Sequence, residues 1–251
     1  SPKLSLIFGP WNKTELYLNA GRGFHSNDAR GTTITTDPKS GDAVDKVSPL
    51  VRSNGYEVGV RSEFIRGLQT SVSLYRLDFA SELLFVGDAG TTEAGRPSRR
   101  DGIEISNYYK PTDWLTVDAD LAFARARFRD NEPGGNRIPG AVEGVASLAL
   151  AVDNLGPWFG ALQLRYFGPR PLIEDNSVRS RSTNTLNGRL GYRFSRKLQV
   201  ELEGFNLANR KDSAIDYYYA SRLPNEAAPV DDIHFHPIES RSFRVNFTVN
   251  F

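Results

Sequence analysis

The feature that most constrains this sequence is a period of two in side-chain polarity, which recurs along the chain. The last ten residues, SFRVNFTVNF (242–251), show it without a break, because Phe and Val occupy every second position and Arg, Asn and Thr lie between them. This alternation is typical of a β-strand with one apolar and one polar face. The stretches 56–65, 115–128, 185–194 and 197–207 repeat it. The chain is therefore expected to be all-β.

The spacing of these stretches predicts about eleven strands joined by connections of two lengths. The expected strands are residues 4–8, 14–24, 56–65, 68–86, 99–109, 115–128, 142–152, 158–167, 185–194, 197–207 and 242–251. Short turns are expected near 10–14, 66–67, 110–114, 153–157 and 195–196, and longer loops at 25–53, 87–98, 129–140, 168–182 and 208–240. A β-sandwich has no reason to gather its long loops at one end, whereas an outer-membrane barrel has short periplasmic turns and long outer loops. The pattern predicts a transmembrane antiparallel up-and-down β-barrel in a bacterial outer membrane.

Composition excludes several classes of protein. The formal net charge of +1 offers no electrostatic basis for a nucleic-acid partner, and the lack of Cys excludes disulfides and thiolate metal sites. The longest apolar run, VASLALAV (145–152), is far shorter than the roughly 20 residues that a membrane helix needs. The mean hydropathy of -0.43 is compatible with a membrane barrel, because half of each strand faces water.

The two faces of the strands have different expected environments. Phe and Val side chains on the apolar face are expected to contact lipid. Charged residues within the strands are expected to line a wide, wet lumen: Asp118, Asp120, Arg125, Arg127, Arg189, Arg193, Glu201 and Glu203. Trp11, Trp114 and Trp158 all lie in or beside short turns, so they are predicted to form part of an aromatic girdle at one membrane interface.

An odd number of strands leaves two interpretations of how the barrel closes. Eleven up-and-down strands begin and end in the same direction, so the first and the last cannot pair antiparallel, and proteins avoid open edges. Either twelve strands form a small barrel, or the chain is part of a larger one. Eleven is half of 22, the strand number of the plugged outer-membrane transporters.

Several stretches resemble a known family. They are TELYLNAGRGFHSNDARGTT (14–33), EVGVRSEF (57–64), SLYRLDFASELLFVGDAGTTEAGRPSRRDGIEISNYY (73–109), GFNLANRKDSAIDYYYASRLP (204–224) and FRVNFTVNF (243–251). The most specific pieces are GRGFHSNDARG (21–31), FNLANRK (205–211) and the terminal Phe251. Together these stretches look like the C-terminal half of the barrel of a TonB-dependent outer-membrane receptor.

The resemblance implies a domain, a function and partners. It implies that residues 1–251 are the C-terminal part of a plugged barrel whose plug domain and N-terminal strands are absent from this sequence. The family couples its barrel to an inner-membrane energy source and imports metal chelates, usually ferric siderophores or cobalamin. The implied partners are outer-membrane lipid, the N-terminal barrel half and plug, the TonB complex acting through the plug, and the outer-membrane assembly machinery. Phe247, Val249 and Phe251 resemble the signal that this machinery reads.

Polar and aromatic residues of the long loops are the candidate contacts for a small-molecule substrate. They are His25, Asp28, Arg30, Arg170, Arg179, Arg181, Tyr217, Tyr218, Tyr219, His234 and His236. Arginine suits an anionic chelate, and aromatic rings suit stacking on a catecholate or a corrin. The alternative is that the arginines are solvated and the tyrosines pack loops together. His234 and His236 would share one face of a strand. Two such ligands without a third are not enough to predict a metal site. No cofactor is expected.

The sequence does not predict an enzyme. His25, Ser26 and Asn27 are adjacent in the chain, whereas a catalytic nucleophile and its base come from positions that converge in space. Gly21 and Gly23 lack the strand-to-helix context of a phosphate-binding loop. Two other functions remain as alternatives: a passive porin-like barrel of about twelve strands, and a soluble β-rich protein used for binding or adhesion.

Overall fold

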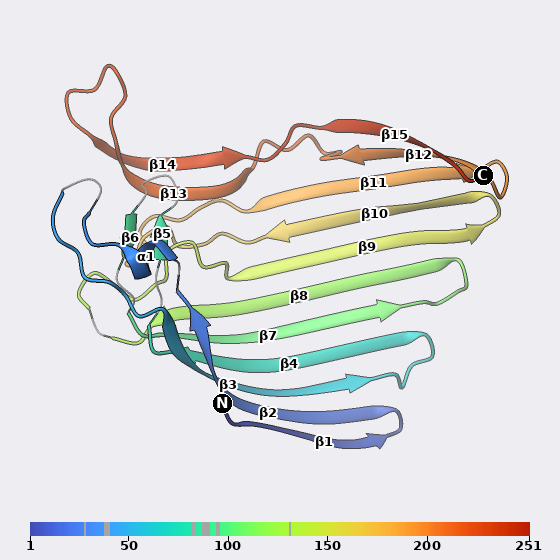
Figure 1. Cartoon of the computed structure of the whole chain (residues 1–251). Helices are drawn as coiled ribbons and strands as arrows, with labels where there is room; N and C mark the ends of the chain where they lie inside the picture. Colours follow the sequence, from blue (N-terminus) through green and yellow to red (C-terminus); the bar gives the residue numbers. More distant parts are fainter. Residues whose placement is uncertain (28, 38–40, 82–83, 87–90, 94–95, 131) are drawn as a thin grey trace.

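The main element of the protein is one antiparallel sheet of eleven strands, in the order β1-β2-β3-β4-β7-β8-β9-β10-β11-β12-β15 (Figure 1). The structure is a computed structural model, and it describes residues 1–27, 29–37, 41–81, 84–86, 91–93, 96–130 and 132–251. The strands of the sheet are β1 (Lys3–Trp11), β2 (Thr14–Ser26), β3 (Leu50–Ser62), β4 (Leu68–Phe79), β7 (Ser98–Tyr109), β8 (Leu115–Phe128), β9 (Gly144–Leu155), β10 (Trp158–Phe167), β11 (Thr183–Arg193), β12 (Leu198–Phe205) and β15 (Ser242–Val249). All neighbours pair antiparallel, so the expected up-and-down all-β fold is confirmed.

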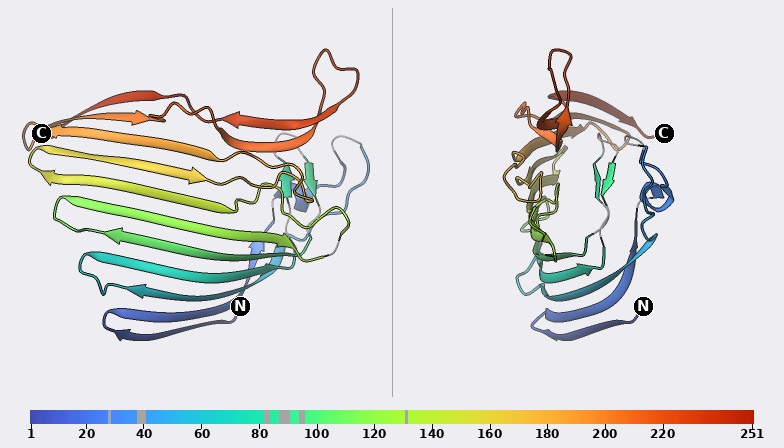
Figure 2. Two further views of the ribbon diagram at one scale, coloured as in Figure 1. Left: turned by 180° about the vertical axis from the view of Figure 1, so that it is seen from behind. Right: turned by 90° about the vertical axis from the view of Figure 1, so that its left-hand side faces the viewer.

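The sheet is bent into an open trough (Figure 2), and its two faces differ in polarity. The register places Leu202 opposite Leu190 and Val245, while Glu201 lies opposite Gly191 and Asn246. Leu202 is 46% exposed, whereas the Glu201 side chain is only 15% exposed. Side chains on the concave face of a curved sheet lie closer together, and are therefore less exposed, than those on the convex face. The polar face, whose side chains are less exposed, is therefore the concave one. The predicted alternation of Leu202 and Glu201 between the two faces is confirmed.

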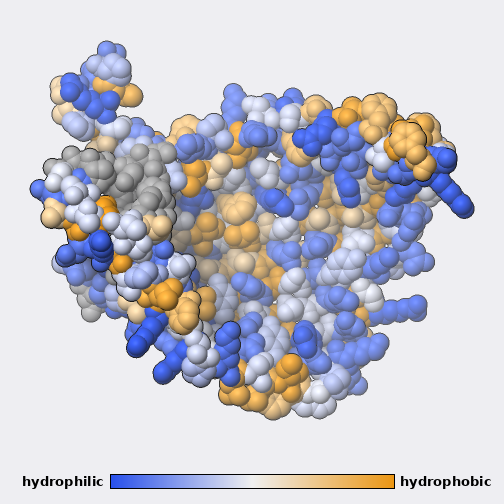
Figure 3. Space-filling model, in the orientation of Figure 1, coloured by the Kyte–Doolittle hydropathy of each residue, from blue (hydrophilic) through white to orange (hydrophobic). Residues whose placement is uncertain are grey.

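Hydrogen bonds between neighbouring strands connect the polar side chains of the concave face. Asn19 accepts a hydrogen bond from Ser5 at 2.6 Å and donates one to Glu57 at 3.0 Å. At the other edge of the sheet, Asn246 donates to Glu203 at 3.0 Å. Figure 3 looks into this hollowed side and shows hydrophilic residues spread over it, with hydrophobic residues between them. The face has the mixed, hydrogen-bonded character expected of a wet lumen.

Aromatic rings on the concave face lie over glycines of the neighbouring strand. The described residues contain three such directly opposed pairs: Tyr17 with Gly59, Tyr75 with Gly102, and Phe159 with Gly191. A Cβ atom would approach the ring to 2.2 Å at Gly59, 2.4 Å at Gly102 and 2.1 Å at Gly191. These glycines are therefore required by the rings that cover them, since a strand glycine otherwise weakens a sheet.

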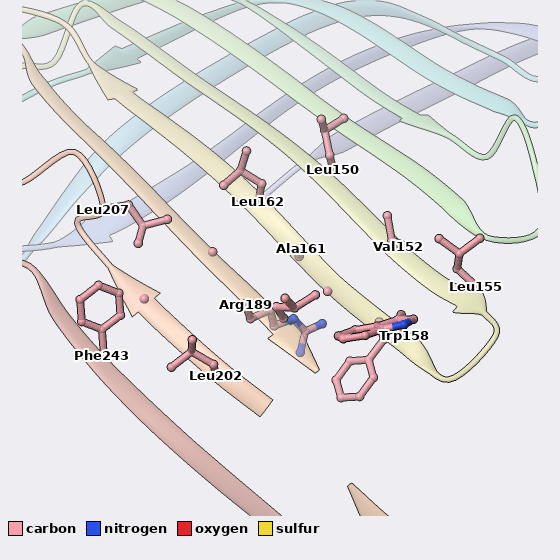
Figure 4. A pocket seen from close by; sticks show the side chains of 15 residues that line it. Leu150, Val152, Leu155, Trp158, Ala161, Leu162, Arg189, Leu202, Leu207 and Phe243 are labelled. Atoms are coloured by element: carbon pink, nitrogen blue, oxygen red, sulfur yellow. The ribbon is translucent and has the colours of Figure 1, made fainter. Parts of the chain in front are cut away.

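The apolar face contains a shallow hollow over β9 to β15 (Figure 4). Leu150, Leu162, Leu202 and Phe243 contribute side chains to it from four different strands, and its volume is about 640 Å³. The many large apolar side chains left exposed on this face are abnormal for a surface in water and expected for one in lipid. Within the described residues, no helix is both long enough and apolar enough to cross a membrane.

The prediction that Arg125 and Arg127 line the lumen is wrong. Strand β8 pairs Leu121 with Ile105, and Phe123 with Ile103, on the apolar face. A period of two keeps Arg125 and Arg127 on that same face. The inward positions at this end of β8 are Ala126 and Phe128, which pack against Ile138 from the following loop. The polarity of the convex face therefore changes along the strand instead of remaining apolar.

The long connections contain more regular structure than expected. β4 ends at Phe79, and β5 (Leu84–Val86) pairs with β6 (Thr91–Glu93) in a separate hairpin, so the expected strand 68–86 is too long. The expected loop 208–240 contains the hairpin of β13 (Ser213–Ser221) and β14 (Val230–Pro237). The expected loop 25–53 contains a short helix, α1 (Ala29–Thr33), and ends early because β3 begins at Leu50. β3 ends at Ser62, so its connection to β4 is longer than the expected turn at 66–67.

The two ends of the sheet differ as the connection lengths predict. Trp11, Trp114 and Trp158 all lie at the end with the short turns, and the hairpins and long loops lie at the opposite end (Figure 1). β1 and β15 each pair with a single neighbour in the sheet, which is therefore open. The C-terminus lies at the short-turn end. These positions agree with the predicted topology, while the place of the tryptophans at a membrane interface stays a prediction.

Candidate functional site

A groove of about 810 Å³ opens at the loop end of the concave face. Its wall comes from the last residues of β10 and the first residues of β11, and β13 covers it from the loop side. Its polar and aromatic lining includes Arg165, Phe167, Thr185, Tyr217 and Tyr218. Among the described residues, no carboxylate pairs with the exposed Arg165. The groove thus contains one exposed guanidinium without a carboxylate partner in the described residues, and two tyrosines from β13. The carboxylates of Glu174 and Asp216 also line it and are paired with Arg96 and Arg170.

A buried ion pair holds β13 over this groove. Arg170 donates to Asp216 at 3.0 Å, and the two side chains are 7% and 6% exposed. The backbone amide of Arg170 also donates to the Ser180 hydroxyl at 3.0 Å. A buried charge requires a partner, because removing it from water is costly. Arg170, predicted as a ligand contact, therefore shapes the groove through Asp216.

A second ion-pair cluster joins three loops at the same end of the sheet. Arg96 donates to both carboxylate oxygens of Asp130, at 3.0 and 2.8 Å, and also to Glu174 and to the Gly135 carbonyl. Its guanidinium lies 4.2 Å from the centre of the Phe128 ring. The hydrogen bonds from Arg96 hold the pKa of Asp130 below its usual range. The pair therefore remains charged at neutral pH and is lost only as the pH falls through that lowered pKa.

The other predicted arginines divide between structural and solvated positions. Arg179 donates to Glu143 at 2.5 Å and to the Pro169 carbonyl at 3.0 Å, and Glu143 also accepts from Arg137 at 2.6 Å. Arg179 is thus part of a loop ion-pair network. Arg181 is exposed. Asp28 and the side chain of Arg30 lie outside the part that the structure describes.

The predicted tyrosines and histidines gather on the hairpin β13–β14. Tyr219 stacks on His234 with 3.9 Å between ring centres, and Tyr217 contacts His236 edge-on at 6.4 Å. His234 and His236 share one face of β14, as the HxH spacing predicts. No group of three metal-ligating side chains occurs among the described residues. His25 lies elsewhere, at the end of β2, with its ring 5.7 Å from that of Phe79.

A family comparison decides what kind of barrel contains this groove. A family model described as TonB dependent receptor-like, beta-barrel, matches residues 1–207. The chain belongs to the TonB-dependent receptor family. The resemblance found in the sequence is thereby confirmed, and membership favours a receptor over the porin-like and soluble alternatives.

Solved structures of TonB-dependent receptors share this fold over nearly the whole chain. The ferric-catecholate import receptor Fiu from E. coli K12 is 19% identical, with a TM-score of 0.72, and the match covers 99% of this chain and 34% of Fiu. The ferric yersiniabactin uptake receptor FyuA from Yersinia pestis is 18% identical, with a TM-score of 0.73 and coverages of 99% and 37%. The copper transporter OprC is 19% identical, with a TM-score of 0.71 and coverages of 99% and 39%. The chain thus spans just over a third of the length of these receptors.

Two features at the loop end of the sheet escaped the sequence analysis. Arg165 and Phe167 were assigned only to a strand, although they occupy its inward positions at the loop end, where β10 borders the groove. The alternation along β10 could have predicted them, because every second residue of that strand, including Arg165 and Phe167, faces inward. The cluster of Arg96, Asp130 and Glu174 had no such signal, because its members come from three separate loops.

Proposed function

We propose that this chain forms part of the barrel wall of an outer-membrane receptor that takes up a metal chelate, such as a ferric siderophore or cobalamin. Uptake would be driven by the TonB complex acting through a plug domain. Membership of the TonB-dependent receptor family supports this proposal. The printed descriptions of Fiu, FyuA and OprC, which name ferric-catecholate import, ferric yersiniabactin uptake and copper transport, support a metal-containing substrate.

In this proposal residues 1–251 are the C-terminal part of a larger barrel. The open edges at β1 and β15 support it, since unpaired backbone groups in hydrocarbon are unfavourable by several kcal/mol each. Further strands would pair with both edges, and the plug would lie against the concave face. The exposed alternation of Phe247, Val249 and Phe251 supports a role as the signal for outer-membrane assembly. No nucleic-acid partner is proposed.

The observation that carries the proposed uptake is the composition of the loop-end groove. Arg165 presents a guanidinium without a carboxylate partner in the described part of the chain, and Tyr217 and Tyr218 of β13 line the same groove. An anionic aromatic chelate would match both features, because guanidinium pairs with carboxylate or catecholate oxygen and rings stack on rings. In this proposal the groove lies at the long-loop end of the barrel, which faces outward, where a substrate first arrives.

Replacing Arg165 in the intact receptor tests this assignment. Arg165→Gln is expected to weaken the binding of an anionic ferric chelate about 10- to 100-fold, because a charge-assisted hydrogen bond contributes roughly 1.5–3 kcal/mol. Binding would be measured by titration of the purified receptor with ferric catecholate, ferric yersiniabactin and cobalamin, and uptake with radioactive iron in cells. Arg196→Gln is the matched control, since Arg196 is exposed in a short turn at the opposite end. Equal binding by both variants for every chelate would contradict the role of the groove.

A further inference from the structure

The loop-end groove is lined mainly by apolar side chains, although it lies on the concave face of the sheet, away from lipid. Its larger apolar residues are Val142, Phe167, Leu172, Ile173, Ile215 and Ile238. Ile215 is 37% exposed, and Phe167 is 40% exposed. On the convex face, contact with lipid would explain such exposure. In a groove that opens to water, the same exposure indicates a ligand with an apolar part.

The groove is polar at its deep end and apolar at its mouth. Strand β10 runs from the short turns toward the loops, so Arg165 lies about 6.6 Å deeper along the strand than Phe167. The register places Ser147 of β9 and Thr185 of β11 directly opposite Arg165. Neighbouring strands thus provide a hydroxyl side chain on each side of the arginine. The aliphatic residues belong to the loops and to β13, beyond the ends of these strands.

The charges of the groove leave one cation for a ligand. Arg170 pairs with Asp216 at 3.0 Å, and Glu174 pairs with Arg96. Among the described residues that line the groove, Arg165 is the one charged side chain without a partner of opposite charge. A ligand with several anionic groups would place the others against aliphatic side chains, where the loss of hydration is unfavourable. The charge pattern therefore favours a monoanion with a bulky apolar part.

We propose that the groove selects a monoanionic metal chelate that carries aliphatic chains. The anionic group binds Arg165, and the chains pack on the apolar residues at the mouth. The volume of about 810 Å³ is within the range of roughly 300–1,000 Å³ for small-molecule sites, so it accommodates chains of several carbon atoms. This inference rests on the function proposed above and narrows its substrate class. It assigns the binding of the anion to Arg165 and the selection for aliphatic chains to Ile215.

Two ferric chelates that differ only in their chains test the inference in the intact receptor. Both are monoanionic ferric complexes of a citrate-linked bis-hydroxamate, one with acetyl groups and one with octanoyl groups on its arms. Binding is titrated by quenching of intrinsic fluorescence in a single detergent, so that partition of the longer chains into micelles is the same for every variant. The parent receptor is expected to bind the octanoyl chelate on the order of 100-fold more tightly than the acetyl chelate, as the burial of a few methylene groups predicts.

Variants of the groove separate the two contacts. Ile215→Asn is expected to weaken the binding of the octanoyl chelate about tenfold and to change that of the acetyl chelate by less than about twofold. Ile233→Asn is the matched control, because Ile233 lies on the same hairpin, is also 37% exposed and does not line the groove. Arg165→Gln is expected to weaken the binding of both chelates by the same factor, since it removes the contact that they share. Folding of each variant is checked by heat-dependent migration on a gel.

Equal affinity of the parent receptor for the two chelates, or no binding of the octanoyl chelate, overturns the inference, and neither result depends on how a variant folds. Equal losses of octanoyl-chelate binding in Ile215→Asn and Ile233→Asn overturn it as well. Uptake of radioactive iron is measured in parallel. Uptake of a chelate without any preference for chains leaves the proposed function standing and removes the inference. A parent receptor that prefers the octanoyl chelate but takes up no chelate contradicts the proposed function and leaves the specificity of the groove standing.

Discussion

At the residue scale, one buried asparagine explains a motif that carries the family resemblance. Asn206, in the FNLANRK stretch, is 4% exposed and has a φ of 47°, in the left-handed region. Its side chain accepts from the Arg210 amide and donates to the carbonyls of Arg210 and Glu239, all at 2.9 Å. Asparagine tolerates left-handed backbone better than most residues. The motif is therefore a turn that joins the end of β12 to the segment before β15.

Asn206→Ala is expected to lower the free energy of unfolding by about 2–4 kcal/mol, because it leaves buried backbone groups unpaired and strains a left-handed position. The measurement is urea unfolding of the receptor in detergent, followed by intrinsic fluorescence. Asn209→Ala is the matched control, since Asn209 also has a positive φ of 49° but is exposed. A control that loses as much stability as Asn206→Ala would show that backbone strain alone matters here.

The buried pair of Arg170 and Asp216 makes a second prediction at this scale. Arg170→Met is expected to destabilise the loop region by about 3–5 kcal/mol, because it leaves the Asp216 carboxylate buried without a partner. The double variant R170M/D216L is expected to recover most of this loss, since it removes both buried charges. Limited proteolysis of the β13–β14 region measures the effect. A double variant as sensitive to protease as Arg170→Met would contradict this explanation.

At the element scale, neighbouring strands are joined by paired side chains as well as by their backbones. Phe159 lies over Gly191, where an added Cβ would be 2.1 Å from the ring. Gly21 is also a strand glycine, but an added Cβ there would be 3.5 Å from the nearest atom, on the Lys3 side chain. The two glycines share a residue type and differ in what covers them.

Gly191→Ala is therefore expected to destabilise the barrel by about 1–3 kcal/mol, through displacement of the Phe159 ring. Gly21→Ala is expected to change stability by less than about 0.5 kcal/mol. The temperature at which the folded band is lost on a gel compares the two variants. If the double variant F159A/G191A is as stable as Phe159→Ala, contact with the ring explains the loss at Gly191. A further drop in the double variant would contradict that.

The opposite faces of β12 provide a second prediction for an element. Leu202→Arg is expected to reduce stability by about 2–4 kcal/mol, because it places a charge in hydrocarbon near the bilayer midplane. Glu201→Arg, one residue away on the concave face, is expected to cost far less, since that side chain is among polar groups. Assembly into the outer membrane of cells is the measurement. Similar losses for the two variants would mean that the apolar face does not contact lipid.

At the scale of the whole molecule, the two ends of the sheet have different architecture. Loops at one end are tied by the ion pairs of Arg96, Arg179 and Arg170, whereas the opposite end has only short turns. The long loops are predicted to lie outside the cell and the short turns in the periplasm.

Single cysteines test this orientation cleanly, because the chain has no Cys of its own. Thr36→Cys and Asn225→Cys, in the long connections, are expected to react with a membrane-impermeant thiol reagent in intact cells. Asn12→Cys, in the turn between β1 and β2, is expected to react only after the outer membrane is opened. The reverse pattern would invert the topology.

The sequence by itself determined the strands, their order and the two ends of the sheet. The alternation of apolar and polar residues is a local property that can be read from the sequence. A short turn, such as the one at residues 12 and 13, forces the next strand to pair with the strand before it. For that reason the eleven strands, their antiparallel pairing and the position of Trp11, Trp114 and Trp158 at one end were all predictable. The opposite faces of Leu202 and Glu201 followed from the same period.

Only the tertiary structure decided what the charged residues do. The charge of Arg125 and Arg127 suggested the lumen, although their parity with Leu121 and Phe123 assigns them to the convex face. The structure showed that the convex face becomes polar beyond Phe123. Arg170 looks like a free loop cation, yet its partner Asp216 is 46 positions away. The loop hairpins and the groove beside Arg165 likewise depend on contacts between distant segments. A period of two specifies alternation, while the identity of each face and the partner of each charge arise only when the whole sheet has assembled.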